Sequence, residues 1–144
     1  MPVQVIKRFI NEHDAALEKS VRLPEAGATA HTDVISLNVD KGRAVTADFE
    51  IHADAAALAA GKRAILTPEH SADGQTWAAA PFAGLVVTGG ASGGSSAATF
   101  CQIAPEPETL RQYVRLAVEV DAEAGDVSAA FAWIALVPQP CRIV

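Results

Sequence analysis

The stretch RAVTADFEIH, residues 43–52, alternates strictly between apolar and polar side chains. An alternation with a period of two places the two sets on opposite faces of an extended chain, which is typical of a β-strand with one buried face. We expect Val45, Ala47, Phe49 and Ile51 to point inward, and Thr46, Asp48, Glu50 and His52 to point outward. This stretch therefore predicts a half-buried strand and favours an all-β fold.

The same pattern returns in LRQYVRLAVEV, residues 110–120. Shorter runs of strand length occupy residues 33–39, 63–67, 82–88 and 97–103, and Gly, Pro and Asp-Gly turn signals separate them. Several short strands at such intervals predict an antiparallel β-sandwich or jelly roll. The chain is rich in alanine, and two short segments, residues 12–22 and 53–60, leave helix and loop equally open.

A length of 144 residues suits a single domain. We expect residues 25–144 to form one sandwich domain, and residues 1–24 to form an N-terminal arm, a first strand or a short helix. The start of the chain carries large apolar side chains at strand-like spacing. These are Val3, Val5, Ile6, Phe9 and Ile10.

The charge balance narrows the classes of partner. Eleven basic residues against seventeen acidic ones give a net charge of −6. Nucleic-acid binding depends on clustered Lys and Arg, and anionic membranes also attract basic surfaces, so we expect neither partner. The sequence has no long apolar span, and its N-terminus lacks the apolar core of a signal peptide, so we expect synthesis in the cytoplasm without export.

No motif nominates a catalytic or cofactor site. His13, His31, His52 and His70 lie in separate segments without metal-binding spacing, and we expect them at the surface. No Ser lies in a GxSxG elbow, and Cys101 and Cys141 form no CxxC pair. We therefore expect no enzyme activity, no metal and no cofactor.

Two loops resemble ligand sites in composition. The acidic segment with Asp121, Glu123 and Asp126 offers carboxylates for calcium, but it lies between two expected strands and is better explained as a polar hairpin turn. The glycine-rich residues 89–94 precede a strand pattern rather than a helix, so they predict a surface loop rather than a phosphate site.

The run VSAAFAWIALV, residues 127–137, is apolar on both faces. One face carries Val127, Phe131, Trp133 and Val137, and the other carries Ala130, Ala132, Ile134 and Leu136. Such a strand is covered either by its own domain or by another chain. A subunit contact through Ala130, Ala132, Ile134 and Leu136 therefore stands beside simple intramolecular cover.

Two local signatures resemble a known family. In EHSADGQTW, residues 69–77, a strand ends, an SxDG turn reverses the chain and Trp77 returns toward the core; RQYVRL, residues 111–116, has the form of the matching late strand. Over about residues 25–137 the order of these segments resembles the small jelly-roll cement, or decoration, proteins of tailed-bacteriophage capsids. Similar segments also occur in discoidin-like carbohydrate-binding sandwiches.

The resemblance implies a structural virion protein on the outside of a capsid, with the major capsid protein as partner and a homotrimer as the expected assembly. In that family the N-terminal segment is commonly an arm on neighbouring subunits, which makes Val3, Val5, Ile6, Phe9 and Ile10 the expected capsid contacts. A first strand of the domain's own sheet is the alternative for this segment. A carbohydrate-binding module would expose aromatic rings, and here the sequence leaves only Tyr113 as an exposed candidate.

Overall fold

The computed structural model describes residues 17–37, 47–102 and 110–138, in which every regular element is a β-strand and no helix occurs. Because there is no helix, no described segment qualifies as a membrane-spanning helix. The strands are β1 (Glu18–Arg22), β2 (Thr29–His31), β3 (Ile35–Ser36), β4 (Ala47–Ala53), β5 (Arg63–Ser71), β6 (Ala78–Ala79), β7 (Leu85–Thr88), β8 (Ala98–Gln102), β9 (Tyr113–Val120) and β10 (Phe131–Pro138).

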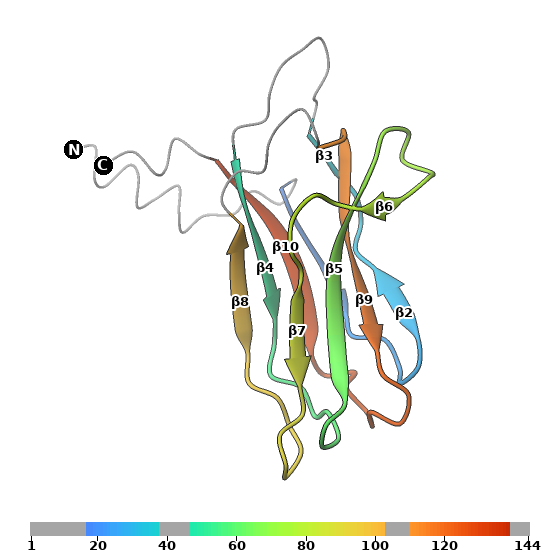
Figure 1. Cartoon of the computed structure of the whole chain (residues 1–144), viewed down its shortest axis with the longest axis vertical. Coiled ribbons are helices and arrows are strands. Elements are labelled where there is room, and N and C mark those ends of the chain that lie inside the picture. Colours follow the sequence, from blue (N-terminus) through green and yellow to red (C-terminus); the bar gives the residue numbers. More distant parts are fainter. Residues whose placement is uncertain (1–16, 38–46, 103–109, 139–144) are drawn as a thin grey trace, which may run out of the picture.

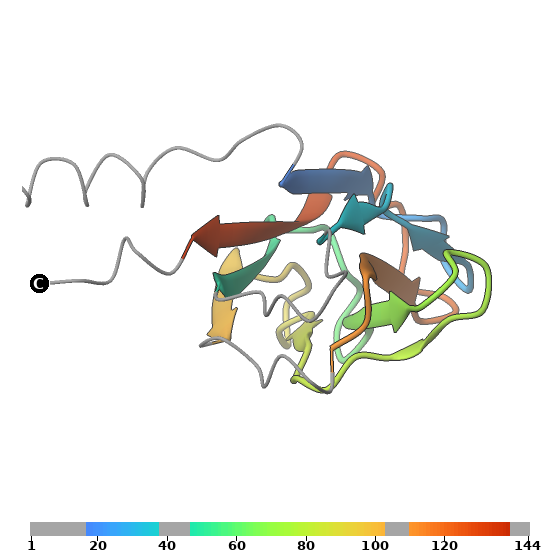
Figure 2. The ribbon, with the colours of Figure 1, turned by 90° about the horizontal axis from the view of Figure 1, so that it is seen from above.

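The strands form two antiparallel sheets packed as a sandwich (Figures 1 and 2). Sheet A has the order β1-β10-β4-β8, and sheet B has the order β2-β9-β5-β6. Strand β3 also pairs with β9, and β7 also pairs with β5, so β2 and β3 share one position in sheet B, and β6 and β7 share another.

The order of pairing identifies the type of sandwich. Strands of the first half of the chain pair with strands of the second half in reverse: β1 with β10, β2 with β9, β4 with β8 and β5 with β7. Such a folded-over ribbon, wrapped so that its strands alternate between two sheets, is the jelly roll. The predicted all-β, antiparallel sandwich fold is confirmed.

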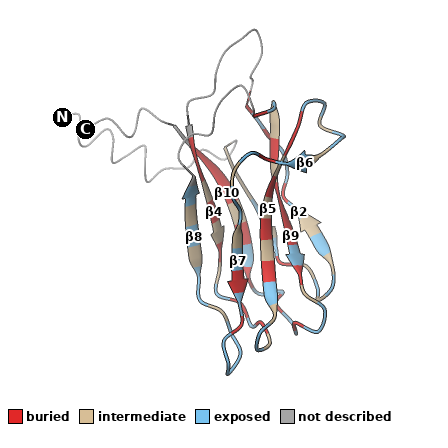
Figure 3. Ribbon diagram, viewed as in Figure 1, coloured by how far each residue is buried: buried red, intermediate tan, exposed pale blue. Residues whose placement is uncertain are grey.

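The core lies between the sheets and draws on both of them (Figure 3). Strict alternation produces it, because every second side chain of the long central strands points to the opposite sheet. The largest fully buried side chains come from these strands and from the connections at their ends. They include Phe49, Ile51, Leu58, Leu66, Leu116, Val118, Val120 and Ile134.

The two stretches with the clearest alternation are strands as predicted. Residues 47–52 lie in β4, where Phe49 and Ile51 are fully buried, while residues 43–46 lie outside the described part. Residues 113–120 form β9, and the inward positions of that stretch are buried. Asp48 is on the outward face of β4, as expected, yet it is 6% exposed, so this face is less open to solvent than the alternation implies.

The structure decides the conformation of the two segments for which the sequence left helix and loop open. Residues 18–22 of the first segment form strand β1. Residues 54–60 of the second are an irregular connection in which Ala56 and Leu58 are buried in the core. Alanine has a high helix propensity, but burial against a sheet decides the conformation of a short segment.

The last predicted strand begins later than expected. Residues 127–130 form a turn, where Val127 is buried in the core rather than lying on the face of Phe131 and Trp133. The strand itself, β10, starts at Phe131 and pairs with β1 on one side and β4 on the other. The face of Ala132 and Ile134 is buried against sheet B, whereas Phe131 on the opposite face is 38% exposed.

A proline and a glycine set the change of partner along β5. Pro68 lacks an N–H, and it lies between the residues that pair with β7 (63–66) and those that pair with β6 (69–70). The link between β6 and β7 passes so close that a Cβ on Gly84 would lie 2.0 Å from the carbonyl oxygen of Leu66. Only glycine fits this crossing.

Candidate functional site

The expected subunit-contact residues are part of the core of the sandwich. Ala132 and Ile134 are fully buried within the single chain, and Ala130 and Leu136 are 4% and 9% exposed. All four belong to one cluster with residues of sheet B. Intramolecular cover is therefore the correct alternative for this face, because a partner could reach it only by separating the two sheets.

The expected capsid contacts, Val3, Val5, Ile6, Phe9 and Ile10, lie outside the described residues. The structure begins its description at Leu17, which packs against the core directly before β1. The prediction for this segment therefore stays a prediction.

A polar and aromatic group occupies the outer face of sheet A. The rings of His52 on β4 and Trp133 on β10 stack with centroids 5.1 Å apart and planes at 18°. The Nε2 atom of His52 is 3.0 Å from Oδ1 of Asp54, and its Nδ1 atom is 2.8 Å from Oγ1 of Thr99 on β8. The other carboxylate oxygen of Asp54 accepts the backbone N–H of Phe131.

This group links three adjacent strands. A carboxylate can only accept, so Nε2 of His52 donates to Asp54, and in the neutral ring Nδ1 accepts the hydroxyl proton of Thr99. The order carboxylate, imidazole and hydroxyl is that of a nucleophile relay, but acyl transfer also needs N–H donors aimed at a substrate oxygen. His52 and Thr99 are direct partners in the β4–β8 ladder, so we assign the group to cross-strand stabilisation.

The outer face of sheet B carries a second such group. Nε of Arg115 on β9 donates to Oε1 of Glu69 on β5 at 2.8 Å, and Nε2 of His31 is 3.8 Å from the same oxygen. The guanidinium of Arg115 also covers the ring of Trp77, with its carbon 4.1 Å from the ring centroid. Trp77 thus lies half-buried on this outer face, and its interpretation as an anchor in the core was wrong.

The SxDG turn ends strand β5 beside this group. The carboxylate of Asp73 accepts the N–H groups of Gln75 and Thr76, both at 2.8 Å, and the hydroxyl of Ser71. These hydrogen bonds lower the pKa of Asp73 to about 2. Gly74 adopts φ +77°, which L-residues rarely adopt. The sequence motif is therefore a self-bonded turn that fixes where the chain reverses.

Of the described histidines, His52 and His70 are less exposed than predicted, whereas His31 is exposed as expected. His70 is 6% exposed, and its Nδ1 accepts the backbone N–H of Arg111 at 3.2 Å. Burial, followed by the positive charge of Arg111, lowers the pKa of His70. His52 is held in the group on sheet A, and His31 is exposed near Glu69. His13 lies outside the described residues.

The acidic segment is spread over separate contacts. Asp121 accepts from Nε and from the backbone N–H of Arg63, and these bonds lower its pKa. Asp126 accepts the hydroxyl and the N–H of Ser128, which lowers its pKa too. Within residues 17–37, 47–102 and 110–138, no three His, Cys, Asp or Glu side chains come together as metal ligands.

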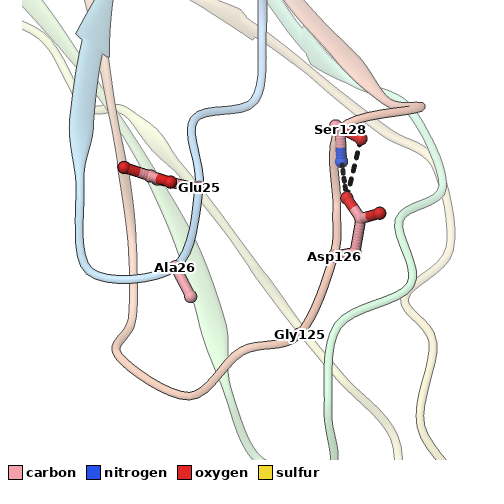
Figure 4. Close-up of a pocket in the computed structure, with 5 residues that line it drawn as sticks. All are labelled: Glu25, Ala26, Gly125, Asp126 and Ser128. Atoms are coloured by element: carbon pink, nitrogen blue, oxygen red, sulfur yellow. Dashed lines mark hydrogen bonds between the residues drawn. The ribbon is translucent and has the colours of Figure 1, made fainter.

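An open pocket of about 530 Å³ lies beside this segment. Glu25 and Ala26 line one wall, and Gly125, Asp126 and Ser128 line the other (Figure 4). The carboxylate of Asp126 turns to Ser128 rather than across the pocket. A small-molecule site requires polar groups that converge on a common point, and this pocket presents few of them.

The sequence did not predict the clusters around His52 and Arg115, because each combines residues from three segments that are far apart in the chain. The available signal was the expected match of residues 69–77 with residues 111–116, and the structure pairs Glu69 with Arg115 and Ser71 with Tyr113.

A scan against models of known protein families finds no match for this sequence, and a search of curated proteins finds none either.

Proposed function

We propose that this protein is a capsid decoration protein of a tailed bacteriophage, which binds the outside of the assembled capsid and stabilises it. The proposal rests on one observation joined to the resemblance. The two segments that carry the resemblance, residues 69–77 and 111–116, pair with each other and lie in a jelly roll. A structural rather than a catalytic role is part of the proposal.

The physical basis is avidity. Several weak contacts made by an oligomer on several capsid subunits reinforce one another, because each contact raises the effective concentration of the next. The apolar residues Val3, Val5, Ile6, Phe9 and Ile10 are the proposed source of buried area on the capsid. At about 25 cal/mol per Å², burial of three or four such side chains contributes several kcal/mol before ordering costs.

The test is cosedimentation with empty capsids assembled from the major capsid protein encoded in the same genome. We expect tight binding to assembled shells and weak binding to isolated capsid subunits. Deletion of residues 1–10 should abolish cosedimentation and leave the midpoint of thermal unfolding nearly unchanged. Equal binding to shells and subunits, or full binding by the truncated protein, would contradict the proposal.

Carbohydrate binding is the second candidate, and the position of the tryptophans favours it. Trp77 and Trp133 both lie on outer sheet faces rather than in the core. Sugar rings stack on such aromatic side chains. The two side chains lie on different sheets, so a glycan site would use one of them. Binding to an immobilised glycan array that is lost in either the Trp77→Ala or the Trp133→Ala variant, without any binding to capsids, would establish this function in place of the first.

A further inference from the structure

One long segment of the chain is free of charge. Residues 74–105 contain no Asp, Glu, Lys, Arg or His. At the chain average of 19% charged residues, about six would be expected in a segment of this length. The described part of it, residues 74–102, comprises β6, β7, β8 and the connections between them.

Strands β7 and β8 of this segment share one side of the sandwich. Strand β8 is the edge of sheet A and β7 lies at the edge of sheet B, and the two strands contact each other and are neighbours when seen from above (Figure 2). Residues 74–79 lie beside β9 instead, where Trp77 contacts Arg115 (Figure 1). We call residues 85–102 the β7–β8 side. The opposite edges behave differently, since β1 carries Glu18, Lys19 and Arg22, and Asp33 follows β2.

The β7–β8 side lacks the usual protection of a sheet edge. Edge strands normally carry charges, often Lys, that discourage pairing with another chain. In the described structure β7 pairs with β5 alone, and its sequence LVVT is β-branched and uncharged. Val86 on β7 is 53% exposed, more than the other exposed large apolar side chains, Val34 and Phe131. A strand edge without these charges favours pairing with another chain.

The charge distribution indicates what covers it. Each copy carries a net charge of −6, and the described carboxylates belong to other parts of the chain than the β7–β8 side, so two copies that meet elsewhere bring like charges together. The β7–β8 side is the surface on which copies can approach without that repulsion. A strongly charged partner would find no complement there, whereas a second copy always presents a matching uncharged side.

Strand pairing alone would not make a stable interface, which uses about 20–30 residues per partner. Strand β7 has four residues, so main-chain pairing supplies only a few hydrogen bonds. The rest of the contact area must come from the small and apolar side chains around it.

We propose that copies of this chain associate with one another through the β7–β8 side. This surface takes the place of the buried face of β10 as the subunit contact. The inference does not depend on capsid binding, because self-association is measured on the isolated protein.

The test measures the mass of the full chain by light scattering across the micromolar range. The wild type should exceed the monomer mass of 14.9 kDa. Val86→Lys should restore the edge charge and weaken association at least tenfold. Thr29→Lys is the matched control, since it adds the same charge at an exposed position on β2, the other edge of sheet B, and should leave association unchanged.

Salt provides an independent readout. Added salt screens the repulsion between negative copies and should leave association unchanged or strengthen it, whereas a contact built from ion pairs would weaken. A wild type that stays monomeric, or a Val86→Lys variant that associates like the wild type, would overturn the inference and leave capsid binding standing. Should Val86→Lys reduce the folded fraction by circular dichroism, Thr88→Lys, at an exposed neighbouring position, decides by the same criteria.

Discussion

The guanidinium carbon of Arg115 lies 4.1 Å from the centre of the Trp77 ring, on the outside of sheet B. Arg115 is held in this position by Glu69, its direct partner across the β5–β9 ladder. The contact therefore fastens the chain that leaves the SxDG turn to the outer face of the sheet. It also explains why a tryptophan that follows a turn is ordered without entering the core.

Replacement of Trp77 by alanine should have a modest effect on stability. A cation–π contact at a partly exposed site contributes about 0.5–1 kcal/mol, and the loss of partial burial adds a similar amount. We expect the free energy of unfolding, measured by urea denaturation, to fall by about 1–2 kcal/mol. Trp77→Phe, which keeps a ring beneath Arg115, should lose less. A loss of about 3–5 kcal/mol is typical of a core aromatic and would contradict the surface position.

The sequence predicted the strands wherever one face is buried and the other is exposed to solvent. Phe49 and Ile51 in β4, and Val114, Leu116 and Val118 in β9, show the alternation that burial on one side demands. It failed for β2 and β6, because strands of two or three residues are too short to show a period. For residues 53–60 the sequence left helix and loop open, and tertiary packing decides for an irregular connection despite the high alanine content.

The candidate contacts were harder to predict. Ala132 and Ile134 lie on one face of a strand whose other face is also apolar. The sequence does not show whether the same chain or a partner covers each face. The group of His52, Asp54 and Thr99 depends on the register between β4 and β8, which are nearly fifty residues apart in the chain. Long-range register follows from topology rather than from any local pattern.

Gly84→Ala should loosen strand β7. The new Cβ would lie 2.0 Å from the carbonyl oxygen of Leu66, so the backbone of β7 or β5 must move. We expect unfolding free energy to fall by about 1–3 kcal/mol, with faster hydrogen exchange at the amides of β7. Gly90→Ala is the control, since its nearest neighbour is 3.7 Å away. Equal stability of the two variants would show that the crossing is not tight.

His70 should make the protein less stable in mild acid. Burial lowers its pKa in the folded state, while the unfolded chain has the ordinary value near 6.5, so protons bind the unfolded chain first. Its contribution is complete above about pH 6.5 and is lost as the pH falls toward the lowered value, with a slope of at most about 1.4 kcal/mol per pH unit.

Urea denaturation at pH 7.5 and 5.5 measures this dependence. His70→Asn keeps an acceptor for the N–H of Arg111 and cannot titrate, so its stability should change less between the two pH values than that of the wild type. His31→Asn, at an exposed site, is the control and should retain the wild-type dependence. A wild-type slope in the His70→Asn variant would mean that other groups cause the acid sensitivity.

Ala132→Asp distinguishes a core face from a subunit contact on β10. Ala132 is fully buried between the two sheets, in register with Val21 and Ala53, so an aspartate there places an unpaired charge in the core. The expected loss is more than about 4 kcal/mol, a large part of the 5–15 kcal/mol that stabilises a typical domain. Circular dichroism should therefore show a largely unfolded chain. Ala129→Asp, at an exposed position in the turn before β10, should fold like the wild type. If Ala132→Asp instead gives a folded monomer from an associated wild type, the face between the sheets is open to a partner, and the assignment of the contact to the β7–β8 side fails with it.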